Sequence, residues 1–177
     1  MTEQEILVLV DDNDNELGTD TRENCHAGKG KRHRAYTALL FHEGRMLLQQ
    51  RSRKKLLWPE AWDVSFTSHV YPGETYQQAA SRRARQELDA KVGELADVHS
   101  FVYFAPQGAN AENEFCRVLV GDFDGKIRPN SKEMMAVRWA TLNEVKSDLA
   151  SNPEEYTPWF RLTFEGFLKS PLSKRYA

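Results

Sequence analysis

Residues 68–88 read SHVYPGETYQQAASRRARQEL, and this stretch decides the fold. It opens with a turn that ends in Pro72-Gly73-Glu74. After the turn, apolar and mostly small side chains recur at every fourth position: Tyr76, Ala80, Ala84 and Leu88. Residues four apart lie on the same face of a helix, and small side chains permit close packing. The stretch therefore predicts a loop followed by a helix over residues 75–88.

The rest of the chain predicts mostly strands. Apolar runs rich in β-branched and aromatic residues cover 6–10, 35–41, 46–48, 98–103, 115–120 and 136–139. A second helix is expected over 158–168, because Thr157 can cap it and Pro158 suits its first position. Many strands with few helices, in mixed order, predict an α+β fold in which helices cover a mixed sheet. Without an internal repeat or a low-complexity linker, residues 1–177 are expected to form a single domain.

Composition limits the classes of function. The chain has 24 Lys and Arg against 26 Asp and Glu, a net charge of −2, so no global field favours nucleic acid and any anion site must be local. The apolar runs are far too short for a membrane span, and the beginning of the chain lacks the pattern of a secretory signal. Two cysteines are too few for a disulfide framework. A cytoplasmic protein without membrane insertion is expected, and the oligomeric state stays open.

Residues 68–88 resemble the Nudix box, in which a loop and a helix present carboxylates to cations on a diphosphate. Three residues match that box: Glu74, Arg82 and Glu87. Four positions depart from it: Ser68 and Asp89 replace glycines, and Arg83 and Gln86 replace acidic residues. Hard cations such as Mg²⁺ need carboxylates, so losing two should weaken hydrolysis. The box therefore favours the Nudix fold more than hydrolysis, although Arg83 and Glu87 alone would equally make an ordinary salt link.

The Arg82-Arg83 pair and most of the chain resemble the type 1 isopentenyl-diphosphate isomerases. That resemblance implies a divalent metal held by three histidines and two glutamates: His26, His33, His69, Glu112 and Glu114. Residues two apart on a strand face the same side, so both carboxylates can reach one ion. The mixed set suits Mn²⁺, Zn²⁺ or Fe²⁺ better than Mg²⁺ or Ca²⁺. A histidine alone is usually an ordinary surface or core residue, which is our interpretation of His42 and His99.

The resemblance also implies a small-molecule diphosphate substrate. The matching basic positions are Arg22, Arg51, Lys55 and Arg83, and phosphate oxygens select such side chains. Each alone would be an exposed cation, whereas together they would supply the local anion site. Glu87 would then hold a second cation, Mg²⁺, that bridges to the substrate phosphates.

The family reaction moves a double bond by protonating one carbon and deprotonating another, through a tertiary carbocation. Trp159 matches the tryptophan whose π face stabilises that cation, although packing at a helix start would explain it equally. Glu114 would combine metal ligation with proton transfer, and Tyr103 would hydrogen-bond it.

The position of the family's catalytic cysteine is Thr67 here. A threonine hydroxyl does not titrate near neutral pH as a thiol does, and a positioned acid or base contributes ~10²–10⁴-fold. Neither Cys25 nor Cys116 is an evident replacement. Three interpretations therefore stay open: an isomerase with reduced activity, a Nudix hydrolase of a diphosphate compound, and a diphosphate-binding protein without turnover.

Overall fold

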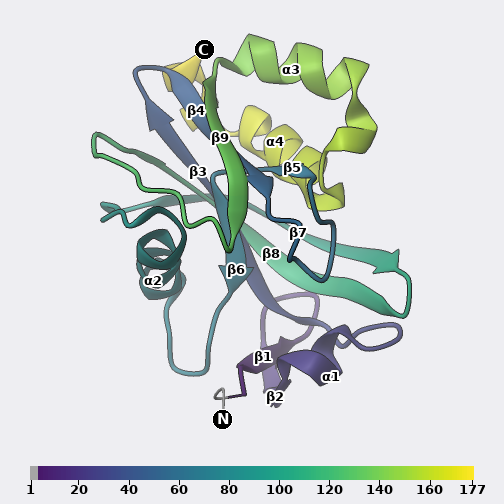
Figure 1. Ribbon diagram of the computed structural model, residues 1–177. Coiled ribbons are helices and arrows are strands. Elements are labelled where there is room, and N and C mark those ends of the chain that lie inside the picture. Colours follow the sequence, from purple (N-terminus) through teal and green to yellow (C-terminus); the bar gives the residue numbers. More distant parts are fainter. Residues whose placement is uncertain (1–3) are drawn as a thin grey trace.

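The computed structural model describes residues 4–177, over which nine strands form one mixed sheet (Figure 1). The strands are β1 (Ile6–Val10), β2 (Glu16–Thr21), β3 (His33–His42), β4 (Arg45–Arg51), β5 (Trp62–Asp63), β6 (Phe66–His69), β7 (Ala96–Gln107), β8 (Asn110–Asp122) and β9 (Met134–Ala140). Strand β3 is central: it pairs in parallel with β8 and antiparallel with β1, β4 and β6. All six predicted strands are present, and most extend beyond their predicted limits.

Helices cover both faces of the sheet. Helix α2 (Tyr76–Leu88) lies on one face, and α3 (Leu142–Ser151) and α4 (Pro158–Lys169) lie on the other (Figure 1). The remaining helical segments are short: α1 (Arg22–His26) and the 3₁₀ turns η1 (Pro153–Glu155) and η2 (Pro171–Tyr176). This arrangement confirms the predicted α+β fold.

Side chains of β3 alternate between two hydrophobic cores, as the pleat of a strand requires. Tyr36, Ala38 and Leu40 pack in the core under α2, together with the small face of that helix. Leu39 and Phe41 instead pack in the core under α4. Because hydrophobic cores cover both faces of β3, the backbone of this strand is held in place, and so are the positions of the residues at its ends.

Helix α2 begins and ends as its sequence demands. The Thr75 hydroxyl accepts from the Gln78 amide and the Gln78 side chain accepts from the Thr75 amide, which makes a capping box. The helix ends at Asp89, whose φ of 49° lies in the left-handed region. Glycine, which the Nudix box has at this position, adopts that conformation without strain. Aspartate tolerates it better than most other residues, so Asp89 can replace the glycine.

Helix α4 begins where expected, with Thr157 in the N-cap position and Pro158 at its first residue, but the capping hydrogen bond expected of the Thr157 side chain is absent. Its hydroxyl instead donates to Oδ1 of Asp63 at 3.2 Å. The side chain at the start of α4 therefore hydrogen-bonds to β5 instead of capping its own helix.

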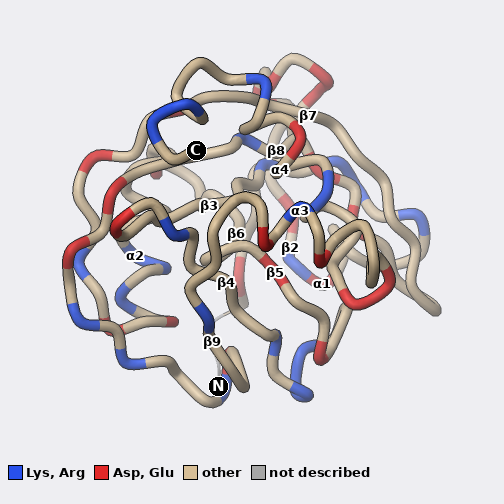
Figure 2. The backbone as a smooth tube through the Cα atoms, turned by 90° about the horizontal axis from the view of Figure 1, so that it is seen from above, with Lys and Arg blue, Asp and Glu red and all other residues tan. Residues whose placement is uncertain are grey.

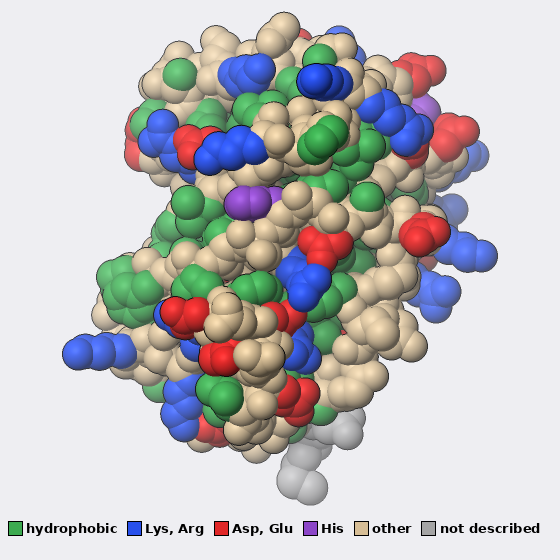
Figure 3. Space-filling view, turned by 180° about the vertical axis from the view of Figure 1, so that it is seen from behind, with side chains coloured by type: hydrophobic (Ala, Val, Ile, Leu, Met, Phe, Trp, Pro, Cys, Tyr) green, Lys and Arg blue, Asp and Glu red, His purple; other side chains and the backbone are tan. Residues whose placement is uncertain are grey.

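Charged residues of both signs are interspersed along the backbone (Figure 2), and charged side chains of both signs are interspersed over the face seen from behind (Figure 3). This distribution matches the net charge of −2 and leaves local clusters as the sites of interest. Within residues 4–177, every helix is too short or too polar to cross a bilayer.

Candidate active site

A cavity of about 700 Å³ collects most of the predicted site residues. Its lining includes Arg22, His26, Arg51, Lys55, Thr67, His69, Arg83, Tyr103, Glu112, Glu114 and Trp159. Two predicted residues do not line it: His33 lies behind Glu114, and Glu87 lies behind Arg83. The cavity has the size of a site for a small molecule.

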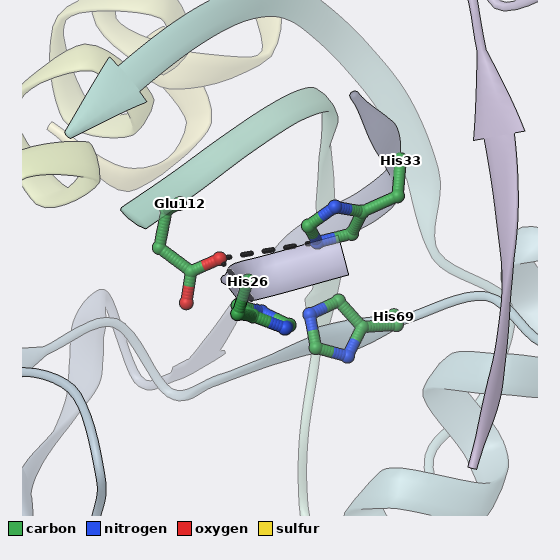
Figure 4. A group of neighbouring side chains, drawn as sticks. All are labelled: His26, His33, His69 and Glu112. Atoms are coloured by element: carbon green, nitrogen blue, oxygen red, sulfur yellow. Dashed lines mark ion pairs between the residues drawn. The ribbon is translucent and has the colours of Figure 1, made fainter. Parts of the chain in front are cut away.

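Three histidines and Glu112 converge from four elements (Figure 4). His26 ends α1, His33 begins β3, His69 ends β6, and Glu112 lies in β8. One ligand atom from each lies within 4.8 Å of the others. Sheet register brings Glu114 into the same group, because it lies opposite His33 in the parallel pair β3–β8.

Backbone hydrogen bonds fix the orientation of two of the imidazoles. Nδ1 of His26 lies 2.7 Å from the carbonyl oxygen of Arg22, and Nδ1 of His33 lies 2.8 Å from that of Lys31. A carbonyl only accepts, so in the neutral rings each Nδ1 carries the proton and each Nε2 offers a lone pair. Within residues 4–177, both Nε2 atoms and Oε2 of Glu112 are buried and make no hydrogen bond, although Nε2 of His26 lies only 3.0 Å from Oε2 of Glu112. A cation at their shared centre would satisfy all three atoms.

The charges of the cluster also fit a divalent cation. Burial lowers the pKa of His69 to about 3, so its ring is neutral near pH 7, the form that binds a metal. Burial and the neighbouring Glu114 carboxylate raise the pKa of Glu112. Oε1 of Glu114 lies 3.4 Å from Nε2 of His33 and 3.3 Å from Nε2 of His69. Two buried carboxylates meet three imidazoles here, and a divalent metal at their centre would add the positive charge that compensates for the carboxylates.

A second cluster of charge lies where α2 meets the cavity. Arg83 pairs with Glu87 on the same helix, and its Nη2 donates to Oε2 of Glu133 at 2.7 Å. Lys55 also pairs with Glu133, and its Nζ lies 3.8 Å from Oε1 of Glu87. The salt bridge between Arg83 and Glu87 is not an ordinary surface pair, because the Glu87 side chain is only 1% exposed.

Glu133 was missed by the sequence reasoning. It precedes β9 and belongs to no motif in the sequence, so a single chain offers no signal for it. Its carboxylate lies between Lys55 and Arg83, in the place where a phosphate would contact both. The two cations and two carboxylates are neutral overall, so an anion gains little there unless another cation joins it.

The other two predicted basic residues differ in their surroundings. Arg22 is exposed, and its Nε lies 3.3 Å from Oε2 of Glu5. Arg51 is buried, and three of its N–H groups donate to Trp58 O, Leu57 O and Asp63 Oδ2. A guanidinium has five N–H donors, so two of them make no hydrogen bond within residues 4–177, and Arg51 lines the cavity.

Thr67 lines the cavity, but its hydroxyl proton is directed to the backbone and not into the cavity. The hydroxyl donates to the carbonyl oxygen of Tyr36 at 2.9 Å. Neither cysteine replaces it, because Cys25 and Cys116 are both buried and neither is among the lining residues. Burial also raises the pKa of the Cys116 thiol.

The aromatic side of the cavity is formed around Trp159, which is 3% exposed. The Trp58 ring meets it edge-on at 5.3 Å, and the Tyr103 ring centroid is 6.0 Å away. The Tyr103 hydroxyl donates to Oε2 of Glu114 at 2.5 Å. The predicted partners Tyr103 and Glu114 therefore do contact each other next to Trp159.

Glu74, which matches the Nudix box, is engaged elsewhere. Its two carboxylate oxygens accept from Nε and Nη2 of Arg82 at 2.7 and 2.8 Å, and it also accepts from the Tyr71 amide. This fork closes the loop onto α2. Glu87 is thus the box carboxylate that lies next to the cavity-lining Arg83.

Comparisons with known proteins agree with these features. The family model described as NUDIX domain matches residues 31–160. An isopentenyl-diphosphate Delta-isomerase of Klebsiella pneumoniae is 34% identical over 91% of this chain and 89% of its own length. One from Nocardia farcinica is 37% identical over 89% of this chain and 91% of its own length.

Solved structures show the same fold. The crystal structure of DR0079 from Deinococcus radiodurans has a TM-score of 0.73 at 26% identity and covers 92% of this chain and 99% of its own. A MutT NUDIX hydrolase from Burkholderia pseudomallei has a TM-score of 0.62 at 20% identity, over 77% of this chain and 98% of its own, which shows the fold alone. Together with the matches along the sequence, these findings place the chain in the isopentenyl-diphosphate Delta-isomerase family of NUDIX proteins.

Proposed function

We propose that this protein is a metal-dependent isomerase that interconverts isopentenyl and dimethylallyl diphosphate, with reduced activity because Thr67 replaces the catalytic cysteine. The observation that carries this proposal is the convergence of three histidines and two glutamates beside a cavity that is basic at one side and aromatic at another. The names of the relatives support the same activity.

The metal of this proposal is a transition metal, Mn²⁺, Zn²⁺ or Fe²⁺, held by His26, His33, His69, Glu112 and Glu114. Bound there, it would supply the positive charge that the two buried carboxylates lack and hold Glu114 ionised. A second cation, Mg²⁺, is proposed between Glu87 and the substrate phosphates. Because Glu87 pairs with Arg83 and does not line the cavity, Arg83 would have to release this carboxylate for Mg²⁺ to bind.

The side chains of the cavity divide the remaining work. Glu114 would take and return protons. The Tyr103 hydroxyl donates to Oε2 of Glu114 at 2.5 Å and would keep this carboxylate oriented. Trp159 would face the carbocation and exclude water from it. Lys55, Arg83 and the two free N–H groups of Arg51 would bind the diphosphate. Thr67 would act as a polar wall, because its proton is committed to the Tyr36 carbonyl.

Two alternatives predict different products. A Nudix hydrolase would release phosphate, but Glu74 is bound to Arg82 and Gln86 cannot hold a cation as a carboxylate does. A binding protein would take up the diphosphate and release it unchanged. Incubating metal-loaded protein with isopentenyl diphosphate should yield dimethylallyl diphosphate and no phosphate, as followed by chromatography and a phosphate assay. Phosphate release in its place would support the hydrolase and contradict the proposal.

The cluster of Lys55, Arg83, Glu87 and Glu133 gives a test of binding. We expect Arg83→Ala and Glu87→Gln each to weaken isopentenyl diphosphate about tenfold or more in Mg²⁺, because a charge-assisted contact or a cation ligand is lost. Added salt should weaken binding in the wild type as well. Isothermal titration with and without Mg²⁺ measures these affinities.

Glu133→Gln should act in the opposite direction when Mg²⁺ is absent. Removing this carboxylate frees Lys55 and Arg83, so affinity should rise about tenfold in Mg²⁺-free buffer. Arg161→Ala is a matched control, because that arginine is exposed and pairs with Glu165 away from the cavity lining. Equal affinities in all four variants and the wild type would remove this cluster from the diphosphate site.

A further inference from the structure

Asp63 is a fully buried carboxylate to which the proposed chemistry gives no role. It is 0% exposed and ends β5, a strand of two residues that pairs with β4. No motif pointed to it in the sequence, although an acidic residue within the apolar stretch 61–66 is itself unusual. A buried charge persists only where donors compensate for it, so its donors show what it does.

The donors to Asp63 come from three segments. Oδ1 accepts from Nε1 of Trp159 at 2.8 Å, from the Thr157 hydroxyl at 3.2 Å and from the Val64 amide at 2.8 Å. Oδ2 lies 3.2 Å from Nη1 of Arg51 and accepts from it. One oxygen thus holds the indole and the start of α4, while the other holds the guanidinium.

The two groups that Asp63 holds also touch each other. Cζ of Arg51 lies 5.2 Å from the centre of the Trp159 ring, a cation–π contact. Both residues line the cavity, whereas Asp63 does not. Asp63 therefore lies behind the basic and aromatic sides of the cavity at the point where they meet.

The backbone fixes the place of Asp63 independently of its side chain. Gln49 lies opposite Asp63 in the β4–β5 pair, two residues before Arg51. The Thr157 amide donates to the carbonyl oxygen of Trp62 at 3.0 Å, which ties the start of α4 to the same short strand. Thr157 gives its hydroxyl to Asp63 instead of capping α4. The Thr157 side chain therefore makes a contact that orients Asp63 and makes no capping hydrogen bond.

We propose that Asp63 is a positioning residue that sets the Arg51 guanidinium and the Trp159 indole relative to each other, and so relates the diphosphate end of a bound substrate to the wall that faces its carbon chain. The roles of Arg51 and Trp159 rest on the proposed function. The contacts that hold them do not.

Two substitutions separate the two oxygens. In Asp63→Asn, the remaining carbonyl oxygen can still accept from Trp159 and Thr157, while the amide NH₂ now faces Arg51 and the charge is gone. Affinity for isopentenyl diphosphate in Mg²⁺ should fall about tenfold, with kcat within about twofold of the wild type. In Asp63→Ala both contacts are lost, so kcat should also fall about ten- to a hundredfold, the scale of a misplaced group near the reacting atoms.

The readout that needs no turnover is the indole N–H signal of Trp159. In a spectrum of ¹⁵N-labelled protein, Trp159→Phe identifies that signal by its loss. We expect it to move less in Asp63→Asn than in Asp63→Ala, because the first variant keeps a hydrogen bond to a neutral carbonyl oxygen and the second loses the acceptor. If Asp63→Ala does not fold, Asp63→Asn still decides through the affinity for isopentenyl diphosphate.

Ser65→Ala is the matched control. Ser65 is equally buried two residues away, donates to Leu47 O at 2.7 Å and accepts from the Leu40 amide at 2.8 Å, and does not line the cavity. It should lower the melting temperature and leave the indole signal and affinity unchanged. If the Asp63 variants behave like Ser65→Ala in every readout, Asp63 is only structural and the proposal is overturned. If affinity and the indole signal respond while no protein makes dimethylallyl diphosphate, the positioning role stands and the isomerase proposal fails.

Discussion

His69→Ala and Glu114→Gln should each remove most of the transition metal that the purified wild-type protein carries, a loss of about tenfold or more in occupancy under matched dialysis. The reason is geometric, because Oε1 of Glu114 lies 3.3 Å from Nε2 of His69 and both belong to the cluster that also contains His26, His33 and Glu112. Removing either ligand leaves the others at the same place with a lower coordination number. Elemental analysis of protein purified and dialysed in parallel measures the effect.

His42→Ala is the control for the metal experiment. His42 lies at the far end of β3, where its Nδ1 faces the carbonyl oxygen of Phe123, and it takes no part in the cluster. Its substitution should leave metal content unchanged. Equal metal in the His42 and His69 variants would show that this cluster does not hold the ion.

Thr67→Cys should raise the rate of isomerisation by about one to three orders of magnitude, the range of a positioned acid–base group. The side chains are similar in size, so the fold should tolerate the change; the lost hydrogen bond to Tyr36 O should cost about 1 kcal/mol of stability. The thiol would face the cavity that Glu114 and Trp159 also line. Conversion of isopentenyl diphosphate by wild type and variant at equal metal content measures the gain.

Thr67→Ser is the matched variant for that experiment. It keeps a hydroxyl and supplies no group that titrates near neutral pH, so its rate should stay within about threefold of the wild type. An increase with serine as large as that with cysteine would mean that space, rather than acidity, limits the reaction. No increase with cysteine, in folded and metal-loaded protein, would contradict the role given to position 67.

The elements that sequence predicted well are those with a strong apolar pattern. Strand β3 is buried on both faces, so it is visible as a continuous apolar run, and helix α2 buries one face, so its apolar residues recur at every fourth position. Strand β6 (Phe66–His69) was missed because it is short and three of its four residues are polar, although it carries Thr67 and His69. Helix α3 was missed despite its capping box, Thr141 with Glu144, since it buries only Leu142 and Val145.

The candidate site divides in the same way. The metal cluster could be predicted because its residue types match a family pattern, and sheet register then explains why His33 and Glu114 meet. Glu133 and Asp63 could not be predicted, because their importance lies in contacts across the fold. Glu133 pairs with Lys55 and Arg83 from a loop before β9, and Asp63 joins β4 to α4. Such pairings have no local sequence signal.

The most direct test of the central claim is to incubate the metal-loaded wild-type protein with isopentenyl diphosphate in D₂O and follow the carbon chain by mass spectrometry and NMR. An isomerase adds a solvent proton to one carbon and removes a proton from another, so even slow turnover leaves deuterium in dimethylallyl diphosphate. We predict deuterium in the product, none when His69→Ala replaces the wild type, and no release of phosphate. Isopentenyl diphosphate recovered without deuterium from folded, metal-loaded wild type and Thr67→Cys alike would contradict the account.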